Sequence, residues 1–148
     1  GHGFMYNGCM GVFDPRPGRA GSIAPGKSRF SSMCPTIIFK DGKPVMVTGA
    51  PGGTQIPMGV LQSILNTIDF DMGVQEAINA PRFSSTSNAI DICNRIPNFT
   101  VEPLERLGYQ VIRSPQSYTF AWVHALGMVQ GKWCGGADPA TDGMALEV

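Results

Sequence analysis

The sequence predicts an α+β fold in which helices pack on one side of a sheet. Two β-rich runs, Thr36–Lys40 and 44–48, flank Asp41-Gly42, a dipeptide typical of a tight hairpin turn. A second hairpin is expected where the runs 122–130 and 132–133 meet at Gly131. Between the hairpins, apolar residues recur at spacings of three and four, which indicates an amphipathic helix over 57–68. Its apolar stripe consists of Met58, Leu61, Ile64, Leu65 and Ile68.

The remaining elements are shorter. We expect a short strand within 3–10 and an irregular loop over 14–27, where three prolines and three glycines exclude a helix. The other expected elements are helices over 74–80 and 101–107, stopped by Pro81 and Gly108, and strands over 90–93 and 109–113. Both runs of the first hairpin are almost continuously apolar, so both of its faces are expected to be buried between layers.

Length and composition restrict the class of protein. The 148 residues fit one domain over 3–148, with Gly1 and His2 compatible with a tag remnant. Eleven Lys and Arg residues balance eleven Asp and Glu residues, which argues against a nucleic-acid partner or an anionic membrane. No apolar run approaches the roughly 18 residues of a membrane span. No signal peptide is expected at the start of this sequence.

The four cysteines show no CxxC spacing, and the sequence contains only two histidines. A zinc site is therefore not expected, because its ligands usually come in close pairs. The simplest interpretation is that the cysteines are small, buried or half-buried side chains. They are Cys9, Cys34, Cys93 and Cys134.

The first candidate site is the turn Pro51-Gly52-Gly53, which joins an expected strand to the expected helix. Glycines let a ligand approach the backbone closely, and a helix N-terminus presents free N–H groups. Gly52 and Gly53 could hold an oxyanion during acyl transfer, or a phosphate. The phosphate alternative is weaker because the turn has neither a Walker lysine nor a GxGxxG pattern. The structural alternative is a strand-to-helix turn that needs glycine for its backbone conformation alone.

The second candidate site is the pair Ser31 and Ser32, which follows Lys27 and Arg29. Two hydroxyls beside cations could bind a carboxylate. The structural alternative is that they satisfy backbone groups where the strand begins. Asp138 and Asp142 lie in a glycine-rich run without EF-hand spacing, and are interpreted as turn-forming aspartates.

Four segments together resemble a known family. They are NGCMGVFDPRPG, APGKSRFSSMCPTIIFKDGKPVMVTGAPGG, VQEAINAPRF and CGGADPATDG, in this order over residues 3–143. This succession resembles the C-terminal part of the small subunit of the γ-glutamyltranspeptidase family. The family belongs to the N-terminal nucleophile (Ntn) hydrolases, so the resemblance implies part of a four-layer αββα sandwich that lacks the N-terminal nucleophile strand.

The resemblance also implies a chemistry. Family members cleave themselves to expose a catalytic threonine, which attacks a γ-glutamyl amide with its own α-amine as base and passes the acyl group to water or an amino acid. Gly52 and Gly53 match the oxyanion-hole glycines, and Ser31 and Ser32 match the pair that holds the substrate α-carboxylate. The threonine is expected upstream of Phe4, so this chain alone should be inactive. Its implied partners are a γ-glutamyl or related acyl substrate and the remainder of the same precursor, without a cofactor or metal.

One segment departs from the family pattern. NGCMGVF aligns with a segment that usually carries a polar residue and an aspartate for the substrate α-amine, and these positions are Cys9 and Val12 here. Because valine cannot pair with an ammonium, the resemblance leaves open an acylase-like relative with a non-glutamyl substrate. An exposed apolar sheet face could also pair with a second copy.

A different class remains open, a non-enzymatic module that uses Gly52, Gly53 and the serines to bind a small anion. The two classes differ in whether a threonine motif precedes this chain. Relatives are often periplasmic or secreted, but the residues present here assign no compartment.

Overall fold

The structure is a computed structural model that describes residues 3–146. Gly1 and His2, discussed above as a tag remnant, lie outside the described residues. The chain divides into two compact units, Gly1–Ser31 and Ser32–Val148, and each is described by itself.

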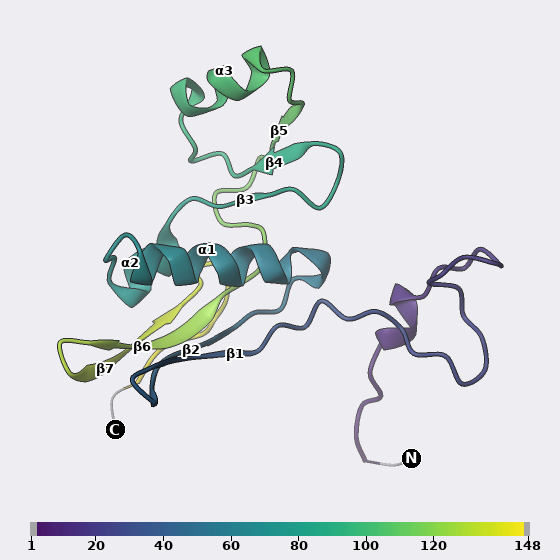
Figure 1. Ribbon diagram of the computed structural model, residues 1–148, viewed down its shortest axis with the longest axis horizontal. Helices are drawn as coiled ribbons and strands as arrows, with labels where there is room; N and C mark the ends of the chain where they lie inside the picture. The colour runs from purple at the N-terminus through teal and green to yellow at the C-terminus, as the bar shows by residue number, and fades with distance from the viewer. Residues whose placement is uncertain (1–2, 147–148) are drawn as a thin grey trace. The chain divides into compact units, whose positions relative to one another are not determined.

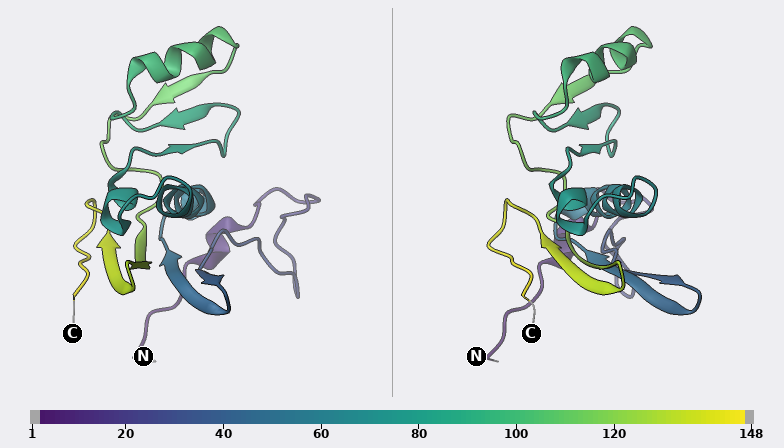
Figure 2. Two further views of the ribbon diagram at one scale, coloured as in Figure 1. Left: turned by 60° about the vertical axis from the view of Figure 1, so that its left-hand side comes forward. Right: turned by 90° about the vertical axis from the view of Figure 1, so that its left-hand side faces the viewer.

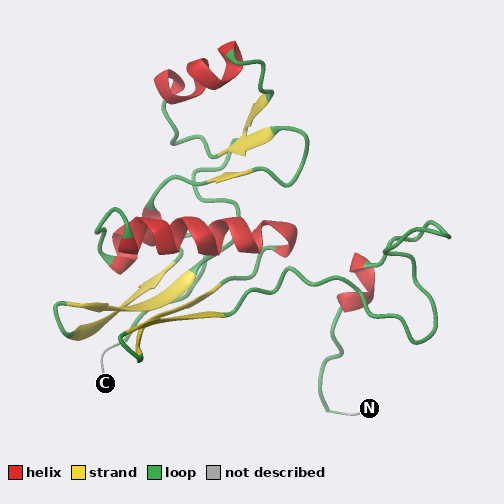
Figure 3. Ribbon diagram, viewed as in Figure 1, coloured by secondary structure: helices red, strands yellow, loops and turns green. Residues whose placement is uncertain are grey.

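The first unit is almost entirely loop, drawn in green in Figure 3. The strand expected within 3–10 is wrong, because residues 3–8 belong to no helix or strand and the 3₁₀ helix η1 (Cys9–Val12) follows them. Asn7 Oδ1 accepts the Cys9 N–H at 3.0 Å, a local turn bond where the chain enters η1. The expected irregular loop follows, with an isolated bridge between Asp14 and Ser22. Its Arg16 guanidinium lies 2.8 Å from Asp14 and lowers the pKa of that carboxyl below its ordinary value.

The second unit contains a four-stranded antiparallel sheet. Its spatial order is β1 (Thr36–Lys40), β2 (Lys43–Gly49), β6 (His124–Val129) and β7 (Lys132–Ala137). Both expected hairpins are confirmed. Asp41 and Gly42 have φ of 51° and 72°, as a two-residue turn that follows the twist of its strands requires. Strand β7 extends to Ala137 and so includes the first glycines of the glycine-rich run that contains Asp138.

Two helices cover one face of this sheet (Figure 1). They are α1 (Ile56–Ile68) and α2 (Val74–Asn79), close to the predicted ranges. The core between layers is formed by Met46, Val74, Ile78, Val123 and Ala125. A second cluster of Ile56, Val60 and Ala121 lies under the N-terminal half of α1.

A smaller layer packs beyond α1. Figure 2 (left) shows α1 along its axis, with the four-stranded sheet on one side and a three-stranded sheet on the other. This second sheet has the order β3 (Phe83–Ser84), β4 (Ile90–Ile92) and β5 (Val111–Arg113), and α3 (Asn98–Arg106) packs against it. The predicted helix over 101–107 is thus confirmed but begins three residues earlier.

The other face of the four-stranded sheet is largely exposed, so the expectation that both faces are buried is wrong within the described residues. The register pairs Ile37 with Val47 and Val47 with Leu126, and places all three on the face away from the helices. Ile37 is 57% exposed and Leu126 is 51% exposed. We call this surface the open sheet face; it consists of Ile37, Phe39, Val47, Leu126, Met128 and Trp133. The apolar pattern of the strands is that of a sheet inside a sandwich. Within the described residues the helices cover one face, and the C-terminal segment crosses only part of the other, where Ala145 lies against Gly135.

Candidate functional site

The glycine turn, Pro51–Gly53, has a backbone that only glycine adopts readily. Gly52 has φ 145° and ψ 17°, and Gly53 has φ 60°. A Cβ added to Gly52 would lie 2.6 Å from the Cα of Ala121, which leaves no room for a side chain. The turn is therefore confirmed as one that needs glycine for both conformation and space.

The N–H groups of this turn are available to a ligand. The Gly52 carbonyl accepts the Gln55 N–H, and the Gly53 carbonyl accepts the Ile56 N–H, so the short helix η2 (Gly53–Gln55) leads directly into α1. Within residues 3–146, neither the Gly52 N–H nor the Gly53 N–H donates to a protein acceptor, and both residues are exposed. Two free donors at the positive end of a 13-residue helix suit an anionic oxygen.

Ser32 is tied directly to the glycine turn. Its hydroxyl donates a hydrogen bond of 2.6 Å to the Gly53 carbonyl oxygen, across the hairpin that separates the two residues. A serine hydroxyl has one hydrogen to donate, so Ser32 must exchange this bond before it can donate to a carboxylate. The sequence analysis treated Ser32 and the glycine turn as two candidate sites, and this bond connects them.

The other expected substrate contacts belong to the first unit. Cys9 and Val12 lie on η1, where Cys9 is half-buried and Val12 is exposed. Ser31 is exposed at the end of the same unit. The structure describes these three residues within that unit only, so their roles stay predictions.

Sequence reasoning missed a buried ion pair in the second unit. Arg82, 2% exposed, follows α2, and its guanidinium pairs with the fully buried side chain of Asp138. Asp138 also accepts the Ala140 N–H at 2.9 Å, so the expected turn role is correct but incomplete. The available signal was that both residues lie in quoted motif segments, APRF and GGADPA, although local spacing does not connect them.

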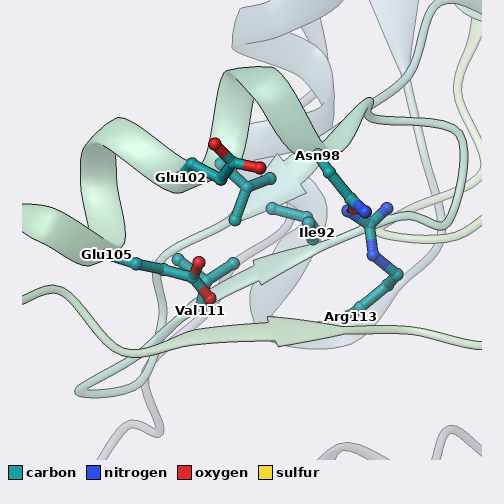
Figure 4. A pocket seen from close by; sticks show the side chains of 7 residues that line it. Ile92, Asn98, Glu102, Glu105, Val111 and Arg113 are labelled. Atoms are coloured by element: carbon teal, nitrogen blue, oxygen red, sulfur yellow. The ribbon is translucent and has the colours of Figure 1, made fainter.

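A cavity of about 290 Å³ lies between α3 and the three-stranded sheet (Figure 4). Its lining residues are Ile92, Asn98, Val101, Glu102, Glu105, Val111 and Arg113, none of which is a predicted site residue. Arg113 already donates to the Asn94 and Ile96 carbonyls, at 3.1 and 2.6 Å. Because its guanidinium is already engaged and no predicted site residue lines the cavity, the glycine turn remains the candidate site.

The cysteines and acidic residues form no further centre in the described residues. All four cysteines are free; Cys93 is buried and Cys9 and Cys34 are half-buried, as expected, whereas Cys134 is exposed and that expectation was wrong. No group of three or more His, Cys, Asp and Glu side chains in residues 3–146 is placed to hold a metal ion. No helix of the described chain combines the length and apolar character needed to cross a membrane.

Comparison with known proteins identifies the fold and family. The family model for γ-glutamyltranspeptidase matches residues 1–148. The glutathione hydrolase proenzyme of Bacillus subtilis subsp. natto is 34% identical over 151 residues, covering 99% of this chain and 26% of that protein. The acylase ACY 1 proenzyme of Pseudomonas sp. (strain SE83) is 41% identical over 116 residues, covering 78% of this chain and 21% of that protein. The chain thus spans about a quarter of the length of these curated relatives.

Solved structures agree with the sequence comparisons. A mutant γ-glutamyltranspeptidase from Helicobacter pylori superposes with a TM-score of 0.84 at 33% identity, covering 95% of this chain and 83% of that one. A cephalosporin acylase from Bacillus halodurans gives a TM-score of 0.79 at 27% identity, covering 90% and 25%. The predicted α+β, Ntn-hydrolase-type fold is confirmed. The chain belongs to the γ-glutamyltranspeptidase family.

Proposed function

We propose that this chain is the C-terminal part of a γ-glutamyltranspeptidase-like amide hydrolase or acyl transferase. In this proposal the Gly52 and Gly53 N–H groups hold the oxyanion, and Ser31 and Ser32 hold the substrate carboxylate. The observation that carries it is the pair of unengaged N–H groups of two exposed glycines where η2 leads into α1, in a turn where Gly52 has no room for a side chain. The nucleophile is a threonine that the resemblance places before Phe4.

The chemistry follows from these positions. The threonine hydroxyl adds to the amide carbonyl while its proton passes to the α-amine. The carbonyl oxygen gains a negative charge, which the two N–H groups stabilise. The C–N bond then breaks, and the α-amine returns the proton to the leaving amine. Water or an acceptor amine releases the acyl group by the same steps in reverse. One such donor typically contributes about 10²- to 10³-fold to kcat.

A hydroxylamine trap tests this assignment. A γ-glutamyl anilide is offered with hydroxylamine to the 148-residue chain and to the full-length protein, and the hydroxamate formed is measured. Hydroxamate is expected from the full-length protein alone. Turnover by the short chain at the full-length rate would place the nucleophile within it and reject the proposal. Anion binding by calorimetry without any turnover of either protein would favour the binding module.

Ser31→Ala combined with Ser32→Ala tests the carboxylate contacts in the full-length protein. The KM for carboxylate substrates should rise more than kcat falls, because the lost contacts act in the ground state as well as the transition state. An unchanged KM would reject this role for the serines.

A second candidate function is an acylase with a non-glutamyl substrate, favoured by Val12. A γ-glutamyl and a glutaryl group carry the same carboxylate and differ in the α-ammonium, which Val12 cannot bind. Equal or greater kcat/KM for glutaryl anilide would support the acylase, and a strong preference for γ-glutamyl anilide would reject it. The likeness to both an acylase proenzyme and a cephalosporin acylase supports making this comparison.

The open sheet face is an apolar surface that a partner could cover. We propose that the remainder of the precursor covers this face in the full-length protein, and that the isolated chain pairs through it with a second copy. Lys substituted at Val47 and Leu126, which are neighbours in the register, should convert such a dimer to a monomer in sedimentation. The same substitution at Leu107, exposed on the far layer, serves as the control.

A further inference from the structure

The loop Thr119–Trp122, which we call the brace loop, lies directly against the glycine turn. The Trp122 N–H donates to the Pro51 carbonyl at 3.0 Å. Ala121 fills the space beside Gly52, where an added Cβ would lie 2.6 Å from the Ala121 Cα. Ala121 also contacts the first turns of α1, since a Cβ at Gly59 would lie 2.8 Å from the Ala121 methyl. The position of Gly52 therefore depends on where Ala121 is held.

The brace loop has a conformation that it does not adopt by itself. Phe120 and Ala121 are consecutive non-glycine residues with φ of 65° and 71°, and both are buried. Side chains disfavour this left-handed region, so a pair of such residues persists only where surrounding contacts determine the backbone.

Arg82 supplies those contacts. Its guanidinium donates to the Ala121 carbonyl at 3.1 Å and to the Thr119 carbonyl at 3.5 Å. A third bond, 3.0 Å long, connects it to the Ile78 carbonyl in α2. Asp138 neutralises the buried charge and is itself held by the Ala140 N–H. A planar guanidinium that makes all these bonds has one orientation, which defines the position of the brace loop.

We propose that Arg82 and Asp138 are positioning residues that, through Ala121, set the direction of the Gly52 N–H. This inference rests on the proposed function, because it assigns the pair a role only if that N–H stabilises an oxyanion. Such a donor must lie about 2.7–3.1 Å from the developing charge, so small displacements reduce kcat. The alternative is that the pair stabilises the core without affecting the turn.

Ala121→Gly separates the two roles in the full-length protein. The substitution removes the methyl group beside the turn, which lowers stability. It also relieves the backbone strain at φ 71°, which raises stability, so the two effects oppose each other. Tm should stay within about 3 °C of wild type. The kcat for the anilide substrate should fall about 10- to 100-fold, while KM stays within about twofold. Ala89→Gly, at a buried alanine outside these contacts, is the matched control and should leave kcat unchanged.

Arg82→Lys provides the second measurement, on protein that is still folded by circular dichroism. Lysine keeps the charge beside Asp138 but cannot also reach the brace-loop carbonyls in the same geometry, so kcat should fall without a matching rise in KM. A wild-type kcat in Ala121→Gly, or equal losses of kcat in Ala121→Gly and Ala89→Gly, would overturn the proposed positioning role. A wild-type protein that releases no acyl product would instead overturn the proposed function. The positioning role of Arg82 and Asp138 would then have no basis.

Discussion

The Ser32 hydroxyl donates a 2.6 Å hydrogen bond to the carbonyl oxygen of Gly53. This bond connects the residue that the resemblance assigns to the substrate carboxylate with the residue that it assigns to the oxyanion. The proposed carboxylate contact and the observed turn contact would therefore use the same hydroxyl hydrogen. A carboxylate that takes this hydrogen releases the Gly53 carbonyl, which still accepts the Ile56 N–H.

Ser32→Ala and Ser31→Ala should consequently differ. Ser32→Ala removes the bond to Gly53 and should lower the free energy of unfolding by about 1 kcal/mol, lower kcat and raise KM. Ser31→Ala should raise KM alone. Steady-state kinetics and denaturant unfolding of the full-length protein measure these effects. Ser32→Thr keeps a hydroxyl and should restore the free energy of unfolding, kcat and KM; failure of this rescue would contradict a role for the bond.

Gly52→Ala and Gly53→Ala should destabilise the protein unequally. An alanine methyl at Gly52 would overlap Ala121, whereas at Gly53 no atom lies within 4 Å. Gly53→Ala therefore carries only the backbone penalty, about 1–2 kcal/mol in the free energy of unfolding, and Gly52→Ala should exceed it. Gly131→Ala, at φ 80° in an open hairpin turn, is the control for the backbone term. Equal losses at Gly52 and Gly53 would show that Ala121 does not crowd the turn.

Arg82→Met should be among the most destabilising substitutions in the chain. It leaves the buried Asp138 carboxylate without its partner, which typically costs about 3–5 kcal/mol in the free energy of unfolding. Adding Asp138→Leu should recover part of that loss, because both charges are then gone. The exposed pair Arg106–Glu102 provides the control, and Arg106→Gln should change stability by less than about 1 kcal/mol. No recovery in the double variant would argue against charge burial as the cause.

Val12→Asp should change the choice of acyl group. The new carboxylate supplies an acceptor for a substrate α-ammonium, so kcat/KM for γ-glutamyl anilide should rise relative to glutaryl anilide. A gain of about tenfold corresponds to one exposed charge contact of about 1.4 kcal/mol. Val12→Asn, of equal size but uncharged, is the matched control and should give a smaller change. An unaltered ratio would place Val12 away from the acyl group.

Local patterns were sufficient for much of this chain. The Asp41-Gly42 turn, the helix from Ile56 and the glycine turn depend on residues within a few positions of one another, and each is confirmed. The strand expected within 3–10 failed because a strand needs a pairing partner, and no strand in residues 3–146 pairs with this segment. The family could also be named, because its motifs stand in order along the sequence.

Only the tertiary structure decided what lies around the glycine turn. Arg82 and Asp138 are 56 residues apart, and neither spacing nor composition connects them. Their pairing depends on how α2, the brace loop and the segment after β7 pack against one another. The same holds for the open sheet face, since an apolar strand indicates that something covers it but not which segment does. The sequence by itself determined the turn and the role proposed for it, because both depend on neighbouring residues, whereas packing decided which residues hold that turn in place.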